Sequence, residues 1–332
     1  MKKLMNTASG YVDEVLEGLV LAHPRLVLGG SSKRVVCRAE GARKGKVGIV
    51  SGGGSGHLPL FTGYVGRGML DTCSIGNVFE GPNVDSCIEA IKLADGGAGV
   101  LRLYGNYGGD RMNFDMAGEF LEDEIETTTV LGTDDIASAS PEEGAKRRGV
   151  AGIIYAYKIA GARAEEDAGL ADVTGTARKA VAATKTIGIA LSPCQVPGSA
   201  RPTFELADDE FEMGMGIHGE PGLWRSRMKP ADEIVDEMMT RLLAERPSGH
   251  RGRTSILVNS LGATPLEELL ILYRRAAWTL KAHGLEIVQP LVGHYATSME
   301  MAGASISLCF LDEELERLLR APSGSPFLEV RA

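Results

Sequence analysis

The chain alternates short runs of apolar residues with longer segments in which apolar residues recur at helical spacing. The short runs include "KVGIVSGG", "GVLRLYGN", "ETTTVLG", "IGIALSPC", "TSILVNSLG", "LEIVQPLVG" and "ASISLCFL", and this pattern predicts buried strands. The longer segments include "GVAGIIYAYKIAGARAEE", "LADVTGTARKAVAATKT", "PADEIVDEMMTRLLAE" and "TPLEELLILYRRAAWTLKAHG", which predict helices. This alternation is typical of an α/β protein with largely parallel or mixed sheets flanked by helices.

Two series of such elements follow each other along the chain. The stretch "PCQVPGSARP" separates them, and 332 residues suffice for two hydrophobic cores. We therefore expect two α/β domains, residues 1–192 and residues 193–332. In the second domain, Pro230 and Asp232 are expected to begin a helix, and Gly284 is expected to end one.

Composition narrows the class of protein. A net charge of −9 argues against nucleic acid or an anionic membrane as the main partner. The N-terminal apolar residues recur at helical spacing, and no stretch is long enough to span a membrane, so a cytoplasmic protein is expected. The five cysteines form no CxxC pair, which favours reduced thiols over a disulfide framework or a zinc site; they are Cys37, Cys73, Cys87, Cys194 and Cys309.

The glycine-rich stretch "SGGGSGHLP" follows the first of these strands and contains His57. Glycines allow backbone N–H groups to converge on one point, as in phosphate-binding loops. The stretch lacks the GK[ST] ending of a nucleotide loop, and no suitably placed acidic residue supports a dinucleotide fold. A tight strand-to-helix turn with an incidental histidine is the alternative interpretation.

Two further loops carry ionisable groups. Asp110, in "GNYGGDRMNF", follows a predicted strand and is either a helix cap or a general base toward a substrate hydroxyl. His218, in "GMGIHGEPG", lies between glycines and can act as a base, a metal ligand or a nucleophile. No HxxxH pair or carboxylate at a metal-binding spacing accompanies it, so no metal site is expected. His294 is expected in a strand-to-helix turn, and the remaining three histidines on surfaces or at helix ends: His23, His250 and His283.

Convergence of these three loops would suit proton transfer on a small polyhydroxylated molecule. The residues alone leave several reaction classes open.

The motifs, taken together, resemble those of the dihydroxyacetone kinase substrate-binding (K) subunit family. "KVGIVSGGGSGH", "NYGGDRMNF", "RRGVAG", "GIALSPCQVPG", "FELADDEFEMGMGIHGEPG", "LVNSLGATPLEEL" and "YATSMEMAGASISL" occur in the family's order. The resemblance runs from "MKKLMN" nearly to the end of the chain, and so many ordered motifs make it specific.

The resemblance implies a role for each candidate residue. His218 matches a histidine that attacks the substrate ketone and forms a covalent hemiaminal. His57 matches a histidine that protonates and deprotonates the carbonyl oxygen, and Asp110 matches the base for the terminal hydroxyl. Gly54, Phe79 and Gly105, together with His218 and Asp110, are then expected to bind the substrate.

The resemblance also implies partners. No nucleotide motif or aspartate-rich magnesium cluster occurs, so the chain is expected to bind no cofactor itself, with ATP or ADP and Mg on a separate L subunit. A homodimer and a phosphotransferase-system protein as phosphate source are further implications.

Departures from the family pattern leave alternatives open. Leu58 stands where the family has Glu, Gly105 where it has Lys, and Glu80 and Gly81 lie in a segment that is more polar in the family. A larger ketose such as erythrulose is therefore one hypothesis, and drift at the outer wall of the pocket is another. A ketose-sensing transcriptional co-activator would need the histidine but not the base, and an isomerase or aldolase-like enzyme is chemically permitted.

Overall fold

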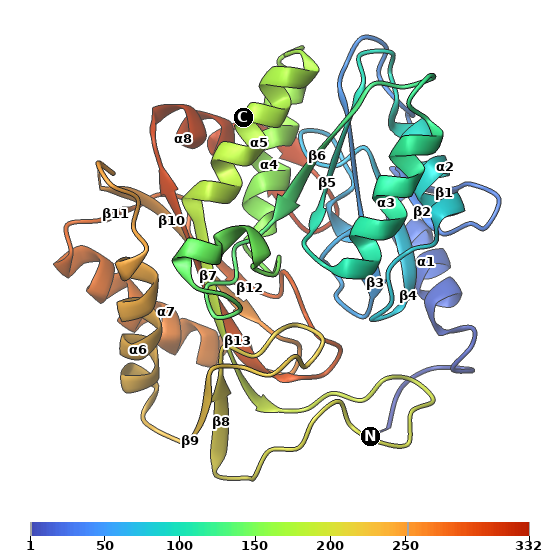
Figure 1. The fold of residues 1–332 in the computed structure, drawn as a ribbon. Helices are drawn as coiled ribbons and strands as arrows, with labels where there is room; N and C mark the ends of the chain where they lie inside the picture. Colours follow the sequence, from blue (N-terminus) through green and yellow to red (C-terminus); the bar gives the residue numbers. More distant parts are fainter. Residues whose placement is uncertain (1, 251, 332) are drawn as a thin grey trace. The chain divides into compact units, whose positions relative to one another are not determined.

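The computed structural model describes residues 2–250 and 252–331 (Figure 1). The chain folds into two compact units. Unit 1 comprises residues within 1–132, 156–179 and 318–332, and unit 2 comprises residues within 133–155 and 180–317. The chain therefore passes between the units four times, and not once near residue 192 as expected. Three of these passages lie inside helices: α4 (Ile153–Glu165), α5 (Leu170–Ala183) and α8 (Glu313–Arg320).

Unit 1 is built on a six-stranded mixed sheet of order β1-β2-β4-β3-β5-β6. Its strands are β1 (Leu26–Gly29), β2 (Val35–Arg38), β3 (Gly48–Ser55), β4 (Thr72–Val78), β5 (Val100–Gly105) and β6 (Thr127–Gly132). β2 pairs antiparallel with β1 and β4, whereas β4, β3, β5 and β6 run parallel to one another. The carboxyl ends of parallel strands meet at one edge of a sheet, where α/β proteins place their ligands. The candidate residues of this unit lie near the carboxyl ends of β3 and β5, in the loops after β3 and β4, and in the first turn of α3.

Helices cover the sheet of unit 1: α1 (Tyr11–Ala22), α2 (Val84–Ala94) and α3 (Gly108–Phe120), with parts of α4, α5 and α8. Figure 1 shows α2 and α3 beside each other, and their apolar residues pack with those of the strands into one core. The side chain of Asn83 caps α2 by accepting a hydrogen bond from the N–H of Ser86 at 2.9 Å. Tyr157 of α4 hydrogen-bonds Ser51 of β3 at 2.8 Å. The short elements are η1 (Thr62–Tyr64) and the strand pair β14 (Ser323–Gly324) and β15 (Glu329–Val330).

Unit 2 is built on a seven-stranded mixed sheet of order β11-β10-β13-β7-β8-β9, with β12 also pairing with β10. Its strands are β7 (Thr184–Ser192), β8 (Glu210–Met213), β9 (Trp224–Arg227), β10 (Arg253–Ser260), β11 (Glu286–Ile287), β12 (Leu291–Gly293) and β13 (Ala302–Leu311). β11 and β12 run parallel to β10, and the other pairs are antiparallel. Since β7 lies between β13 and β8, the strand expected to end the first domain belongs to the second unit.

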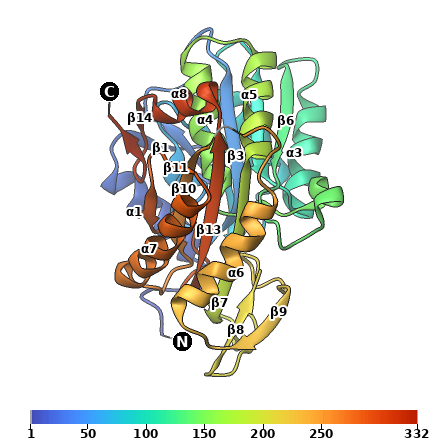
Figure 2. The ribbon, with the colours of Figure 1, turned by 90° about the vertical axis from the view of Figure 1, so that its left-hand side faces the viewer.

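Two amphipathic helices, α6 (Ala231–Ala244) and α7 (Leu266–Ala282), pack against this sheet, as Figure 2 shows for α6 and the long strands β7 and β13. The core between them is apolar and includes two buried phenylalanines, with Met238 and Met239 of α6 fully buried. Pro230 is the N-cap of α6 as expected, and Gly284, at φ +67°, follows the end of α7. The 3₁₀ segment η2 (Pro141–Lys146) completes the unit.

Among the residues that the structure describes, no helix is both long enough and apolar enough to cross a bilayer. Within the same residues, no group of three or more His, Cys, Asp or Glu side chains is placed to hold a metal ion.

Candidate functional site

The glycine-rich loop of unit 1 lies against the loop that follows β4. Gly54, near the end of β3, faces the backbone so closely that a Cβ there would lie 2.8 Å from both Cα of Phe79 and N of Glu80. These are backbone atoms, which cannot move aside as a flexible side chain can. A residue without a side chain is therefore required at position 54, and the two loops are held in contact.

His57 lies between two aromatic rings. Its side chain is 1% exposed and stacks on Phe79, with ring centroids 4.9 Å apart and planes 24° from parallel. Phe61 meets the imidazole edge-on at 6.1 Å. Both phenylalanines have positive φ, +70° for Phe61 and +61° for Phe79. Bulky residues rarely adopt this conformation, and such strained backbone occurs preferentially at functional sites.

Asp110 lies in the first turn of α3 and is 6% exposed. A Cβ on Gly81 would lie 2.3 Å from Oδ1 of Asp110, so the loop after β4 passes directly beside the carboxylate. Asn113 ties the same loop to α3 by donating to the carbonyl of Pro82 at 2.7 Å. The positive end of the helix dipole favours a negative charge at this position. Gly105 ends β5 beside Gly132 of β6.

Unit 1 thus brings together four of the predicted residues. Gly54 touches the backbone of Phe79 and Glu80, Phe79 stacks on His57, and Gly81 of the same loop lies against Asp110. Of the positions that depart from the family pattern, Leu58 is half-buried. Glu80 is exposed, and its carboxylate accepts a hydrogen bond from the side chain of Asn77 at 3.1 Å.

His218 belongs to unit 2, in the loop between β8 and β9. The N–H of Gly219 donates to the carbonyl of Gly216 at 3.1 Å, which closes a four-residue turn with His218 in its third position. The N–H of Gly216 in turn donates to the carbonyl of Glu220 at 3.1 Å. The imidazole side chain is 22% exposed, so the turn presents it at the surface of its own unit.

The carboxylate of Glu220 contacts both the ring and the backbone of His218. Its Oε1 lies 2.9 Å from Nδ1 of His218, and its Oε2 accepts the backbone N–H of His218 at 3.0 Å. Burial alone would raise the pKa of Glu220. The hydrogen bond and charge of His218, with the guanidinium of Arg148, outweigh that effect and lower the pKa to about 2.

Arg148 connects this pair to a buried aspartate. Its Nη1 lies 3.8 Å from Oε2 of Glu220, and its Nε and Nη2 lie 2.9 and 2.8 Å from Oδ2 of Asp135. Nη2 also donates to the carbonyl of Gly214 at 3.2 Å. Burial raises the pKa of Asp135 to about 6, although Arg148 opposes the shift.

Two other side chains hold the backbone of the histidine loop. Glu212, which is 4% exposed, accepts the N–H of Gly222 at 2.6 Å and pairs with Arg225 at 2.8 Å. Ser298 donates to the carbonyl of Ile217, next to the histidine. Sequence reasoning missed Glu212, Glu220, Arg148 and Ser298. Only Glu220 had a sequence signal, since it lies two residues after His218 in the same glycine-rich stretch.

His294 does not lie in a strand-to-helix turn. It follows β12 in the loop that leads to β13, it is exposed, and its Nε2 lies 3.1 Å from the carbonyl oxygen of Gly262. In the described part of the chain no helix directly follows β12, because the backbone returns to the sheet, where β13 pairs with β10. His23 and His283 follow the ends of α1 and α7 as expected.

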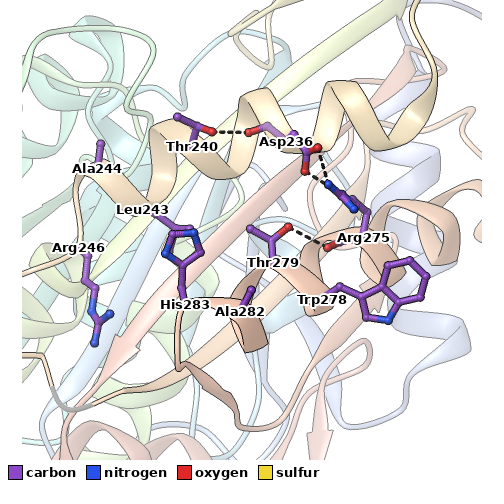
Figure 3. Close-up of a pocket in the computed structure, with 10 residues that line it drawn as sticks. All are labelled: Asp236, Thr240, Leu243, Ala244, Arg246, Arg275, Trp278, Thr279, Ala282 and His283. Atoms are coloured by element: carbon purple, nitrogen blue, oxygen red, sulfur yellow. Dashed lines mark hydrogen bonds and ion pairs between the residues drawn. The ribbon is translucent and has the colours of Figure 1, made fainter.

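A surface hollow of 780 Å³ lies between α6 and α7 of unit 2 (Figure 3). Asp236, which lines it, is held by Arg275 through two hydrogen bonds of 2.8 and 2.6 Å, and this interaction lowers the pKa of Asp236. Trp278 and His283 lie along the α7 side. None of the candidate residues lines this hollow, so it is separate from the candidate site.

Comparisons with known proteins agree with these motifs. The sequence model of the Dak1 domain matches residues 17–327. The PTS-dependent dihydroxyacetone kinase 1, dihydroxyacetone-binding subunit DhaK, of Listeria innocua is 44% identical over 95% of each chain. The L-erythrulose 1-kinase of Mycolicibacterium smegmatis is 41% identical over 98% of this chain and 58% of its own length. The crystal structure of the dihydroxyacetone kinase of C. freundii superposes with a TM-score of 0.91 at 32% identity, covering 99% of this chain and 60% of that one.

Proposed function

Because the chain belongs to the Dak1 domain family, we propose that it is the substrate-binding subunit of a dihydroxyacetone kinase or a closely related ketose kinase. Relatives named as dihydroxyacetone-binding subunits support this proposal over nearly the whole length of the chain. In this proposal a separate L subunit carries the nucleotide and Mg, the phosphate comes from ATP or from a phosphotransferase-system protein, and the chain forms a homodimer.

The observation that carries the proposal is the setting of His218. A small ketose offers little surface for binding, and a covalent bond compensates for that deficit. The glycine-flanked turn presents the imidazole, and Glu220 engages Nδ1, so that Nε2 is the nitrogen directed to chemistry. Nε2 attacks the ketone carbon, the π electrons of the carbonyl move to its oxygen, and that oxygen takes up a proton to give the hemiaminal.

The residues of unit 1 supply the proton transfers of the proposed reaction. His57, fixed between Phe61 and Phe79, donates the proton to the carbonyl oxygen and takes it back when the hemiaminal breaks. Asp110, held at the start of α3, accepts the proton of the terminal hydroxyl as that oxygen attacks phosphorus. Gly54, Phe79 and Gly105 belong to the substrate pocket in this proposal.

Intact-protein mass spectrometry with dihydroxyacetone tests the proposal. We expect one ketose to add to the unaltered protein, no adduct with His218→Ala, and an undiminished adduct with Asp110→Asn. With an L subunit present, Asp110→Asn is expected to lose phosphorylation of the ketose. An adduct that survives His218→Ala, or no adduct on the unaltered protein by mass or by crystal soak, overturns the tether. A protein that forms the adduct but never phosphorylates would instead be a sensor.

A four-carbon ketose such as erythrulose is the second candidate substrate. Position 105 has no side chain where the family has a lysine, five residues before Asp110, and Glu80 turns its carboxylate to Asn77. Both features leave more room than the family pattern allows, and a relative named as an L-erythrulose 1-kinase is 41% identical. Comparing kcat/KM for erythrulose and dihydroxyacetone tests this candidate, and a strong preference for the three-carbon ketose would eliminate it.

A further inference from the structure

The two oxygens of Glu220 make different contacts with the same residue. Oε1 faces Nδ1 of the His218 ring at 2.9 Å, and Oε2 accepts the His218 backbone N–H at 3.0 Å. An ionised carboxylate can only accept hydrogen bonds. The ring nitrogen that faces Oε1 must therefore carry the proton, which places the lone pair of a neutral imidazole on Nε2.

The position of Glu220 is itself fixed on two sides. A Cβ on Gly216 would lie 2.1 Å from Oε2 of Glu220 and 2.6 Å from Nη1 of Arg148, so the carboxylate and the guanidinium fill the space beside this glycine. Arg148 is anchored to Asp135 by two contacts below 3.0 Å. The chain Asp135–Arg148–Glu220–His218 therefore holds the imidazole by side-chain contacts as well as through its own backbone.

We propose that Glu220 is a positioning residue for His218: it fixes the ring in the Nδ1–H tautomer and stabilises the positive charge that the ring acquires when Nε2 bonds to a ketone. This inference rests on the proposed function. As the C–N bond forms, the Nε2 lone pair becomes the new bond and the carbonyl π pair becomes a lone pair on oxygen, which takes a proton from His57. The ring, still protonated on Nδ1, is then a cation that faces the Glu220 carboxylate. Transfer of the Nδ1 proton to solvent water then leaves the neutral hemiaminal.

Serine proteases contain the same arrangement: a buried carboxylate orients the catalytic imidazole and stabilises its cationic form. A purely structural role for Glu220 is the alternative explanation, because Oε2 also accepts a backbone N–H. Glu212 provides a matched control, because it lies in β8 directly before the loop and also contacts the backbone of that loop. It binds the backbone N–H of Gly222 and Arg225, and neither of these contacts involves the imidazole.

The experiment compares the unaltered protein with Glu220→Gln and Glu212→Gln, each labelled with ¹⁵N in its histidines. Spectra recorded near pH 8.5, about two units above the ordinary pKa of histidine, distinguish Nδ1–H from Nε2–H rings. The resonances of His218 are identified among the six histidines by their loss in His218→Ala. Ketose titration followed by intact-mass spectrometry gives the dissociation constant of the adduct for each protein.

We expect the unaltered protein and Glu212→Gln to show the Nδ1–H form of His218. In Glu220→Gln, whose amide can donate as well as accept, we expect a mixture of tautomers and an adduct weakened by about 10–100-fold, by analogy with removal of the hydrogen-bond partner of a metal-bound histidine. Glu220→Asp, which keeps the charge on a shorter stem, should recover part of the affinity and the Nδ1–H signature.

Three results would overturn the proposal: an Nε2–H ring in the unaltered protein, an unchanged tautomer and adduct in Glu220→Gln, or equal weakening in both Gln variants with the tautomer unchanged. Absence of any adduct on the unaltered protein would defeat the proposed function instead. The nitrogen spectra need no ketose, so they would still decide whether Glu220 sets the tautomer.

Discussion

Lys158 is a buried cation in unit 1, and its replacement by Met should change how stability depends on pH. The side chain lies in α4 and is 1% exposed. Its Nζ donates to the carbonyl of Leu318 at 2.7 Å, in the last turn of α8, where the helix dipole favours a cation. Burial nevertheless lowers the pKa of Lys158 from its ordinary 10.5 to about 8.

The size and sign of the effect follow from that shift. Between pH 8 and pH 10.5 the unfolded chain keeps the lysine proton and the folded protein has released it, so the contribution of this group to stability rises with pH. At about 1.4 kcal/mol per pKa unit, the shift corresponds to about 3 kcal/mol over that window. Below pH 8 both states hold the proton, and the folded state carries the full cost of the buried charge.

Urea denaturation followed by far-UV circular dichroism at several pH values between 7 and 10.5 measures the effect. Buried groups such as Cys73 and Tyr155, whose pKa values burial raises, act in the opposite direction, but they are common to both proteins. The informative quantity is therefore the free energy of unfolding of the unaltered protein minus that of Lys158→Met. We expect it to rise by about 3 kcal/mol across the window.

Lys92→Met provides the control, because Lys92 is 48% exposed in the same unit and its charge stays in contact with water. In Lys158→Met the carbonyl of Leu318 keeps its bond from the N–H of Ala321 at 3.3 Å, so the substitution leaves no buried acceptor alone. A difference that stays constant with pH to within about 0.5 kcal/mol would show that the charge on Lys158 is not destabilised by burial.

Two further predictions concern the site and the thiols. Gly54→Ala places a Cβ 2.8 Å from the backbone of Phe79, and we expect a coupled assay with an L subunit to show ketose phosphorylation reduced by about 10–100-fold. Gly109→Ala, whose Cβ meets nothing within 4 Å, should stay within about twofold of the unaltered rate. All five cysteines are buried, and burial raises the pKa of Cys37 to about 11 and that of Cys309 to about 12, so a thiol reagent at pH 8 should react only after unfolding. Rapid labelling of the folded protein would contradict this prediction.

Local pattern was sufficient to predict the strands and helices that adjoin the site. β3, β5 and β10 are short apolar runs ended by turn residues, and Pro230 and Gly284 mark helix limits because their backbone preferences are intrinsic. The hairpin of β8 and β9 was not predicted. Its first strand carries the glutamates of "EFEM", and Glu212 is buried only because Gly222 and Arg225 satisfy it.

Long-range features of the site had no local signal. The chain passes between the two units four times, and three of these passages lie inside helices. Because the helical periodicity is the same before and after such a passage, the sequence pattern does not mark where one unit ends. Phe61 and Phe79 adopt positive φ although nothing in their sequence requires it, so the aromatic setting of His57 could not be foreseen. Arg148 reaches Glu220 across 72 residues, and only the folded unit reveals that contact.

The departures from the family pattern can be understood from the contacts that hold the catalytic candidates. His57 is positioned by two phenylalanine rings, and Asp110 is positioned by the first turn of α3 and the backbone of Gly81. Positions 80 and 105 do not take part in these contacts. The Glu80 carboxylate accepts a hydrogen bond from Asn77, and Gly105, at the end of β5, has no side chain. Side chains at these two positions can therefore change without removing the rings or the helix turn that hold His57 and Asp110, the residues we propose for proton transfer. Under the proposed function, this separation would let relatives accept ketoses of different length while they keep the same two proton-transfer residues.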